Sequence, residues 1–135
     1  MKRDFISILD WTSEEIRSNL DLAVELKDQT KEGKCPQLLQ GKTFGLFFHK
    51  PSLRTRLSFE VGITQLGGTA IVLTEQDFKI GERETVSDVA RVMSRYVDCI
   101  LIRTFSHQMV LDLSKHATVP VVNMLTDFNH PCQLM

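Results

Sequence analysis

Four short apolar runs, separated by segments of helical periodicity, constrain the fold of this 135-residue chain most strongly. The runs span residues 43–48 (TFGLFF), 69–74 (TAIVLT), 99–103 (CILIR) and 119–122 (VPVV). Apolar runs of this length, bounded by turn residues, are typical of strands that are buried on both faces. Because strands that alternate with helices pair in parallel, the pattern predicts an α/β fold with a parallel sheet of about four strands flanked by helices.

The expected helices are marked by apolar residues at three- or four-residue spacing. The first begins where Thr12 and Glu15 have capping-box spacing, and its apolar repeat continues until Gly33. Further helices are predicted over 56–66, 86–95 and about 108–116. Near the end of the sequence, Asn129 or its neighbour can cap a helix that has Pro131 close to its first position.

Composition limits the classes of function. The length, with 42% hydrophobic and 24% charged residues, predicts one domain spanning 1–135. A formal charge of −1 argues against a general nucleic-acid or acidic-membrane binder. No apolar run approaches membrane-spanning length, and the sequence MKRDFISILD is unlike a signal peptide, so we expect a cytoplasmic protein with no membrane partner.

Metal and nucleotide sites have no support in the sequence. The three cysteines, Cys35, Cys99 and Cys132, are far apart and form no CxxC pair, so neither a disulfide framework nor a zinc site is predicted. The triplet 41–43 (GKT) resembles the end of a phosphate-binding P-loop, but Pro36 stands where the motif needs glycine and the triplet precedes a strand. No GxGxxG motif occurs, and no metal or cofactor is expected.

Polar clusters follow three of the four predicted strands: 52–56 after the first, Arg103 at the end of the third and 130–133 after the fourth. Parallel sheets bind ligands beyond the carboxyl ends of their strands. We therefore expect these three clusters to meet at one edge of the sheet.

The first cluster offers donors suited to an anion. Ser52 and Thr55 carry hydroxyls, the helix start at 53–55 presents backbone N–H groups, and Arg54 has a planar set of donors. A cation at a helix start is unfavourable by roughly 0.3–1 kcal/mol, and an anionic ligand reverses that effect. We assign Arg54 to such a ligand, whereas the spacing of Arg56 and Glu60 favours a surface ion pair.

The other two clusters indicate a ligand site only when they are considered together with the first. Taken alone, Arg103 could be a strand-end charge that reaches water, and a lone His130 is more often structural than catalytic. Beside an anion clamp, these residues and Gln133 could polarise a carbonyl and hold an amide-like NH₂ group without a metal.

Two of these motifs resemble one family. The stretch 48–60 (FHKPSLRTRLSFE) resembles the carbamoyl-phosphate signature of the transcarbamylases, usually Ser-Thr-Arg-Thr-Arg, and 130–133 (HPCQ) resembles their second signature. The likeness covers nearly all 135 residues in order and spacing. The loop 73–81 and the triplet 103–105 (RTF) resemble the ornithine-specific members, while aspartate-, acyl-ornithine- or putrescine-specific members remain alternatives.

The resemblance implies transfer of a carbamoyl group from carbamoyl phosphate to the side-chain amine of ornithine, giving citrulline and phosphate without a covalent nucleophile. It implies that Arg54, Thr55, Arg103 and His130 are catalytic. The implied carbamoyl-phosphate ligands are Ser52, Leu53 through its amide, Arg54, Thr55, Lys79, Arg103, His130 and Gln133. Phosphate would contact the first cluster and Arg103, the carbonyl oxygen would contact Thr55, Arg103 and His130, and Gln133 would hold the NH₂ group.

Two residues depart from the family pattern. Leu53 replaces the usual threonine but keeps its backbone N–H, and Lys79 stands where many ornithine enzymes have glutamine. In the family this loop reaches the site of a neighbouring subunit, so Lys79 is either a phosphate contact or a solvated lysine. Cys132 is interpreted as a packed residue at a helix start.

The resemblance also implies one half of the two-domain transcarbamylase fold. Ornithine would bind a second α/β domain that is not part of these 135 residues, so the chain by itself is expected to be inactive as a transferase. A homotrimer or higher homo-oligomer is implied. A non-catalytic anion-binding or assembly module is the alternative.

Overall fold

A parallel sheet of four strands organises the chain in the computed structural model, which describes residues 2–82 and 84–135. In the order β2-β1-β3-β4, the strands have the bounds β2 Thr69–Thr74, β1 Thr43–Phe48, β3 Cys99–Arg103 and β4 Val121–Leu125. Phe48 is in register with both Thr74 and Arg103, so the carboxyl ends of the three strands lie at one edge. The predicted fold class is confirmed.

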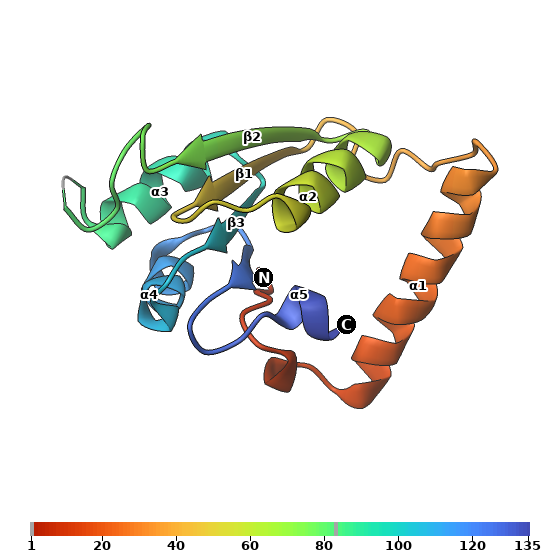
Figure 1. The fold of residues 1–135 in the computed structure, drawn as a ribbon, viewed down its shortest axis with the longest axis horizontal. Coiled ribbons are helices and arrows are strands. Elements are labelled where there is room, and N and C mark those ends of the chain that lie inside the picture. The colour runs from red at the N-terminus through yellow and green to blue at the C-terminus, as the bar shows by residue number, and fades with distance from the viewer. Residues whose placement is uncertain (1, 83) are drawn as a thin grey trace.

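Helices cover the sheet on both faces. Their bounds are α1 Ser13–Lys31, α2 Arg54–Gln65, α3 Val86–Tyr96, α4 His107–His116 and α5 Pro131–Leu134, with a 3₁₀ turn at Ile8–Asp10. Alternation along β3 separates two cores: Ile100 and Ile102 pack with α3 and α4, whereas Leu101 packs with the face that α2 covers. Figure 1 shows α1 at one side, apart from the sheet, and none of its residues is buried.

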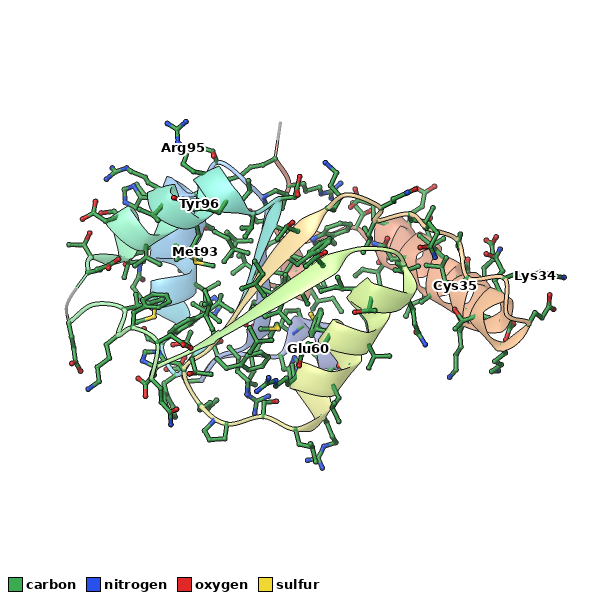
Figure 2. All side chains as sticks on the ribbon, turned by 90° about the horizontal axis from the view of Figure 1, so that it is seen from above. Lys34, Cys35, Glu60, Met93, Arg95 and Tyr96 are labelled. Carbon is green, nitrogen blue, oxygen red and sulfur yellow. The ribbon has the colours of Figure 1, made fainter. Side chains whose placement is uncertain are left out.

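Gly45 in β1 lies close to side chains at the end of α3. A Cβ atom at this position would lie 2.7 Å from the Cε of Met93 and 3.4 Å from the Cγ1 of Val97, so the flexible end of Met93 would have to shift. Figure 2 shows Met93 on α3 beside the sheet and Arg95 pointing away from the body of the molecule.

The fourth strand lies further along the chain than the predicted 119–122, because β4 spans Val121–Leu125. Pro120 has no N–H to donate, although its carbonyl accepts a hydrogen bond from Ile100 N (2.9 Å). At the other end, Asn123 interrupts the apolar run in sequence, but its side chain is fully buried and hydrogen-bonded. The boundary prediction was wrong because a buried polar residue resembles the end of a strand.

The N-terminal segment extends the sheet beside β4. Phe5 N donates to Val121 O (2.8 Å), and Asn123 N donates to Phe5 O (2.9 Å). None of the helices in the described residues combines the length and apolar composition needed to cross a membrane.

Candidate active site

The three polar clusters meet at the carboxyl edge of the sheet and line one open cleft of about 750 Å³. The cleft lies where β1, β3 and β4 end, which confirms the expected meeting of the clusters. Seven of the eight predicted ligands line it: Ser52, Leu53, Arg54, Thr55, Arg103, His130 and Gln133.

The start of α2 opens onto this cleft without a side-chain cap. The helix begins at Arg54, within the helix start expected at 53–55 and two residues before the predicted apolar repeat of 56–66. Its N-cap residue, Leu53, has no side-chain acceptor to cap the first N–H groups. By contrast, α1, α3 and α4 are capped by Thr12, Thr85 and Ser106. No acidic residue lies in the first turn of α2 either. Its first N–H groups are therefore open to an anion in the cleft.

Arg103 connects the end of β3 to the first turn of α2. Its Nη1 donates to Thr55 Oγ1 (2.9 Å), while its buried Nε has no hydrogen-bond partner among the residues described. Burial, and then the positive charge of Arg54, lower the pKa of Arg103 from its ordinary value. The positive charges of Arg54 and Arg103 repel each other across the open cleft, and an anion between them would stabilise both guanidinium groups.

His130 faces the same cleft from the start of α5. Its buried Nδ1 has no hydrogen-bond partner in residues 2–82 and 84–135. Burial first, and Arg103 second, lower the pKa of His130 below its usual value near 6.5. The imidazole is therefore neutral at neutral pH and can donate one N–H to a ligand.

The helix α5 also carries Gln133 and Cys132. Gln133 lines the cleft, and its backbone N–H donates to His130 O (3.0 Å). Cys132 Sγ donates to Asn123 O (3.4 Å), and burial raises the pKa of Cys132 to about 11. A thiol that stays protonated at neutral pH is a poor nucleophile, in agreement with the packed role predicted from sequence.

Two of the charged residues discussed above do not reach the cleft. Arg56 Nε donates to Glu60 Oε2 (2.8 Å) on the surface of α2, which confirms the predicted ion pair; Figure 2 marks Glu60 on that helix. Lys79 lies in the loop between β2 and α3, is more than half exposed and pairs with Glu82 (3.3 Å). Within one chain, Lys79 is therefore not brought to the cleft.

The cleft also contains residues that sequence reasoning missed. Leu125 was missed because the fourth strand was predicted to end at 122. Ser58 and Phe59 lie one helical turn after Arg54 and Thr55, so the i,i+4 rule, applied from the expected helix start at 53–55, could have found them. Ser58 Oγ donates to Thr55 O (3.0 Å).

Fold and cleft together define an α/β domain that can bind an anion and a carbonyl at the carboxyl edge of its sheet. Residues 3–135 match the family described as "Aspartate/ornithine carbamoyltransferase, carbamoyl-P binding domain". The chain belongs to this family.

Individual relatives agree with that match. The ornithine carbamoyltransferase of Anoxybacillus flavithermus is 52% identical over 133 residues, which cover 98% of this chain and 42% of that protein. That of Syntrophotalea carbinolica is 50% identical over 135 residues, 100% of this chain and 45% of that protein. The structure of ornithine carbamoyltransferase from Pyrococcus furiosus has a TM-score of 0.95 at 51% identity and covers 97% of this chain and 42% of its own. The chain thus spans about two-fifths of the length of these relatives.

Proposed function

We propose that the cleft binds carbamoyl phosphate and that residues 1–135 act as the carbamoyl-phosphate-binding domain of an ornithine carbamoyltransferase. The observation that carries this proposal is the uncapped start of α2, which bears Arg54 and opens, together with Arg103 of β3, onto one cleft. An anion there would accept hydrogen bonds from backbone N–H groups and would offset the repulsion between two guanidinium groups.

The phosphate would be held by Ser52, the Leu53 amide, Arg54, Thr55 and Arg103. Leu53 is 72% exposed at the start of α2. Although leucine lacks the hydroxyl of the usual threonine, its backbone N–H remains available as a donor. As the bond from the carbonyl carbon to phosphate breaks, negative charge grows on the leaving oxygen. Donors already fixed around the phosphate stabilise that charge.

The carbamoyl group would lie between β3 and α5. Thr55, Arg103 and the neutral imidazole of His130 can donate to the carbonyl oxygen as the uncharged amine attacks and an oxyanion forms. The side-chain oxygen of Gln133 can accept from the carbamoyl NH₂. The attacking nitrogen then loses a proton, which the departing phosphate can accept, and phosphate leaves with the electron pair of the broken C–O bond.

We assign the amine to a region outside residues 1–135, because the chain spans about two-fifths of the length of its relatives. Ornithine is the favoured amine, because relatives named ornithine carbamoyltransferase are 48–52% identical to this chain. A structure of an N-acetyl-L-ornithine transcarbamylase is 36% identical, with a TM-score of 0.81, over 97% of this chain and 45% of its own. Acyl-ornithine and aspartate therefore remain the alternative substrates.

The proposed assembly is a homotrimer or higher homo-oligomer in which Lys79 reaches the cleft of a neighbouring copy. Its exposed position in the β2–α3 loop, away from the cleft of its own chain, supports this assignment. We further propose a cytoplasmic location, supported by cysteines that are free at all three positions.

Calorimetric titration tests the proposal and separates it from a non-catalytic anion-binding module. The proposal requires carbamoyl phosphate to bind more tightly than inorganic phosphate, because only the former contacts His130 and Gln133. Equal affinity for the two ligands would favour the anion-binding module. The chain alone should produce no citrulline from carbamoyl phosphate and ornithine, and steady production would overturn the assignment of ornithine to another region.

A further inference from the structure

The side chain of Asn123 is fully buried within β4, where the sequence otherwise places apolar residues. Its Nδ2 donates to Ile6 O (3.0 Å) and to Asn129 Oδ1 (2.6 Å). Its Oδ1 accepts from Leu125 N (2.9 Å). All the hydrogen-bonding groups of this side chain are therefore used, and none of them contacts the cleft directly.

These bonds join three segments, one of which leads directly into His130. Ile6 belongs to the N-terminal segment beside β4, Leu125 is a cleft residue at the end of β4, and Asn129 immediately precedes His130. Thr126 N donates to Asn129 O (2.9 Å) and closes the intervening turn on itself. The Asn123 side chain ties that closed turn to the sheet.

The hydrogen bonds at position 123 require a side-chain amide. A residue at 123 must donate twice, to a carbonyl and to an amide oxygen, and must accept once from a backbone N–H. Aspartate would place a carboxylate against two acceptors, and leucine would leave three polar groups, one buried and two half-buried, without these partners. Polar groups that are buried and fully satisfied fix a single arrangement of their neighbours.

We propose that Asn123 is a positioning residue, which holds the turn before α5 so that His130 faces Arg103 across the cleft. The role of this arrangement in ligand binding rests on the proposed function, but the arrangement itself does not. Residues 5 and 6, remote in sequence and outside the cleft, thereby support the site.

Asn129→Ala is the sharpest variant for a test. It removes the bond from Asn123 to the turn but keeps the bonds of Asn123 to Ile6 and Leu125, and Asn129 itself is only half-buried. Asn123→Ala removes all three hydrogen bonds of this side chain and should therefore lower the free energy of unfolding more than Asn129→Ala does. Val121→Ala is the matched control, because it deletes buried volume from the same strand on the face that packs with α3 and α4.

The primary readout is the titration of His130 in the ligand-free chain, followed by NMR. A loosened turn exposes His130 to water and moves it away from Arg103, so its pKa should rise toward 6.5 in Asn129→Ala. Val121→Ala should lower the unfolding midpoint and leave that titration unchanged. In the double variant Asn123→Ala with Asn129→Ala, the two changes should be non-additive, because both delete the same bond.

The second readout is affinity for inorganic phosphate and carbamoyl phosphate. Asn129→Ala should lower the affinity for carbamoyl phosphate by roughly three- to tenfold, the usual effect of losing one hydrogen bond. The affinity for inorganic phosphate should fall less. An unchanged His130 titration in Asn129→Ala would overturn the positioning role. If Asn129→Ala shifts the His130 titration but the parent chain binds neither carbamoyl phosphate nor inorganic phosphate, the positioning role is supported and the proposed function is overturned.

Discussion

The guanidinium of Arg103 donates from Nη1 to the hydroxyl of Thr55 over 2.9 Å and so joins the end of β3 to the first turn of α2. Arg103→Lys should lower affinity for carbamoyl phosphate at least about tenfold, because a lysine supplies a point charge without the planar set of donors. Calorimetry on the folded variant measures this change. Thr55→Ala should have a smaller effect, and an Arg103→Lys variant with parental affinity would contradict the assigned contact.

In the complete enzyme we expect the same residues to affect turnover. Arg54→Ala and Arg103→Ala should each lower kcat by roughly 10²–10³, as expected for donors aimed at a developing oxyanion. Steady-state citrulline formation by a full-length enzyme carrying this domain checks the expectation. Near-parental turnover in either variant would remove that residue from the catalytic set.

Arg54 and Arg56 are two residues apart and should respond differently to the same substitution. Arg54→Gln should weaken phosphate binding at least about tenfold, because the variant loses a charge that faces the cleft. Arg56→Gln should leave the affinity almost unchanged and lower the free energy of unfolding by at most about 0.5 kcal/mol, because its exposed pair with Glu60 is weak. If Arg56→Gln weakened binding as much as Arg54→Gln did, the separation of the two arginines would be wrong.

The buried cysteines should be chemically inert. Burial raises the pKa of Cys99 to about 12 and that of Cys132 to about 11, so both remain thiols at pH 7.5. Iodoacetamide should modify them slowly, as followed by peptide mass spectrometry, and Cys132→Ala should bind carbamoyl phosphate like the parent chain. Rapid alkylation of Cys132 in the folded chain would contradict this account.

His130 should make stability depend on pH in a defined direction. The pKa of His130 in the folded chain lies below its ordinary value of about 6.5. At a pH between the folded-state pKa and the ordinary pKa, the imidazole is protonated in the unfolded chain but not in the folded chain. The free energy of unfolding therefore falls as pH drops through this window and is unaffected by His130 above it. Urea denaturation of the parent and of His130→Gln from pH 7.5 to 5 isolates the effect.

In that comparison the parent should lose stability relative to His130→Gln only as the pH falls below about 6.5, the ordinary histidine value. A constant difference across the range would show that His130 titrates alike in both states. Bound phosphate should raise the pKa of His130, because a nearby anion favours the imidazolium. The same NMR titration, repeated with phosphate, measures that change.

Much of the fold could be predicted from local patterns. The bounds of β1, β2 and β3 agree with the predicted runs, because apolar composition and burial coincide there. The ion pair of Arg56 and Glu60 follows from helical spacing alone. The gathering of three clusters follows from parallel pairing, which brings all carboxyl ends to one edge.

What could not be predicted depends on tertiary contacts. The true end of β4 depends on Asn123, whose burial is tolerated because its side chain is hydrogen-bonded, in part to Ile6, which is remote in sequence. Leu125 was missed as a cleft residue for that reason. The role proposed for Lys79 would need a neighbouring copy, and local pattern does not distinguish a solvated lysine from a contact across an interface.

Titration of the 135-residue chain with carbamoyl phosphate, alongside Arg54→Gln and Gln133→Ala, tests the central claim most directly. We predict saturable binding with one site per chain, weakened toward both carbamoyl phosphate and phosphate in Arg54→Gln. In Gln133→Ala we predict weakened binding of carbamoyl phosphate alone. A folded parent chain that binds no carbamoyl phosphate, or an Arg54→Gln variant that binds it as tightly as the parent, would contradict the account.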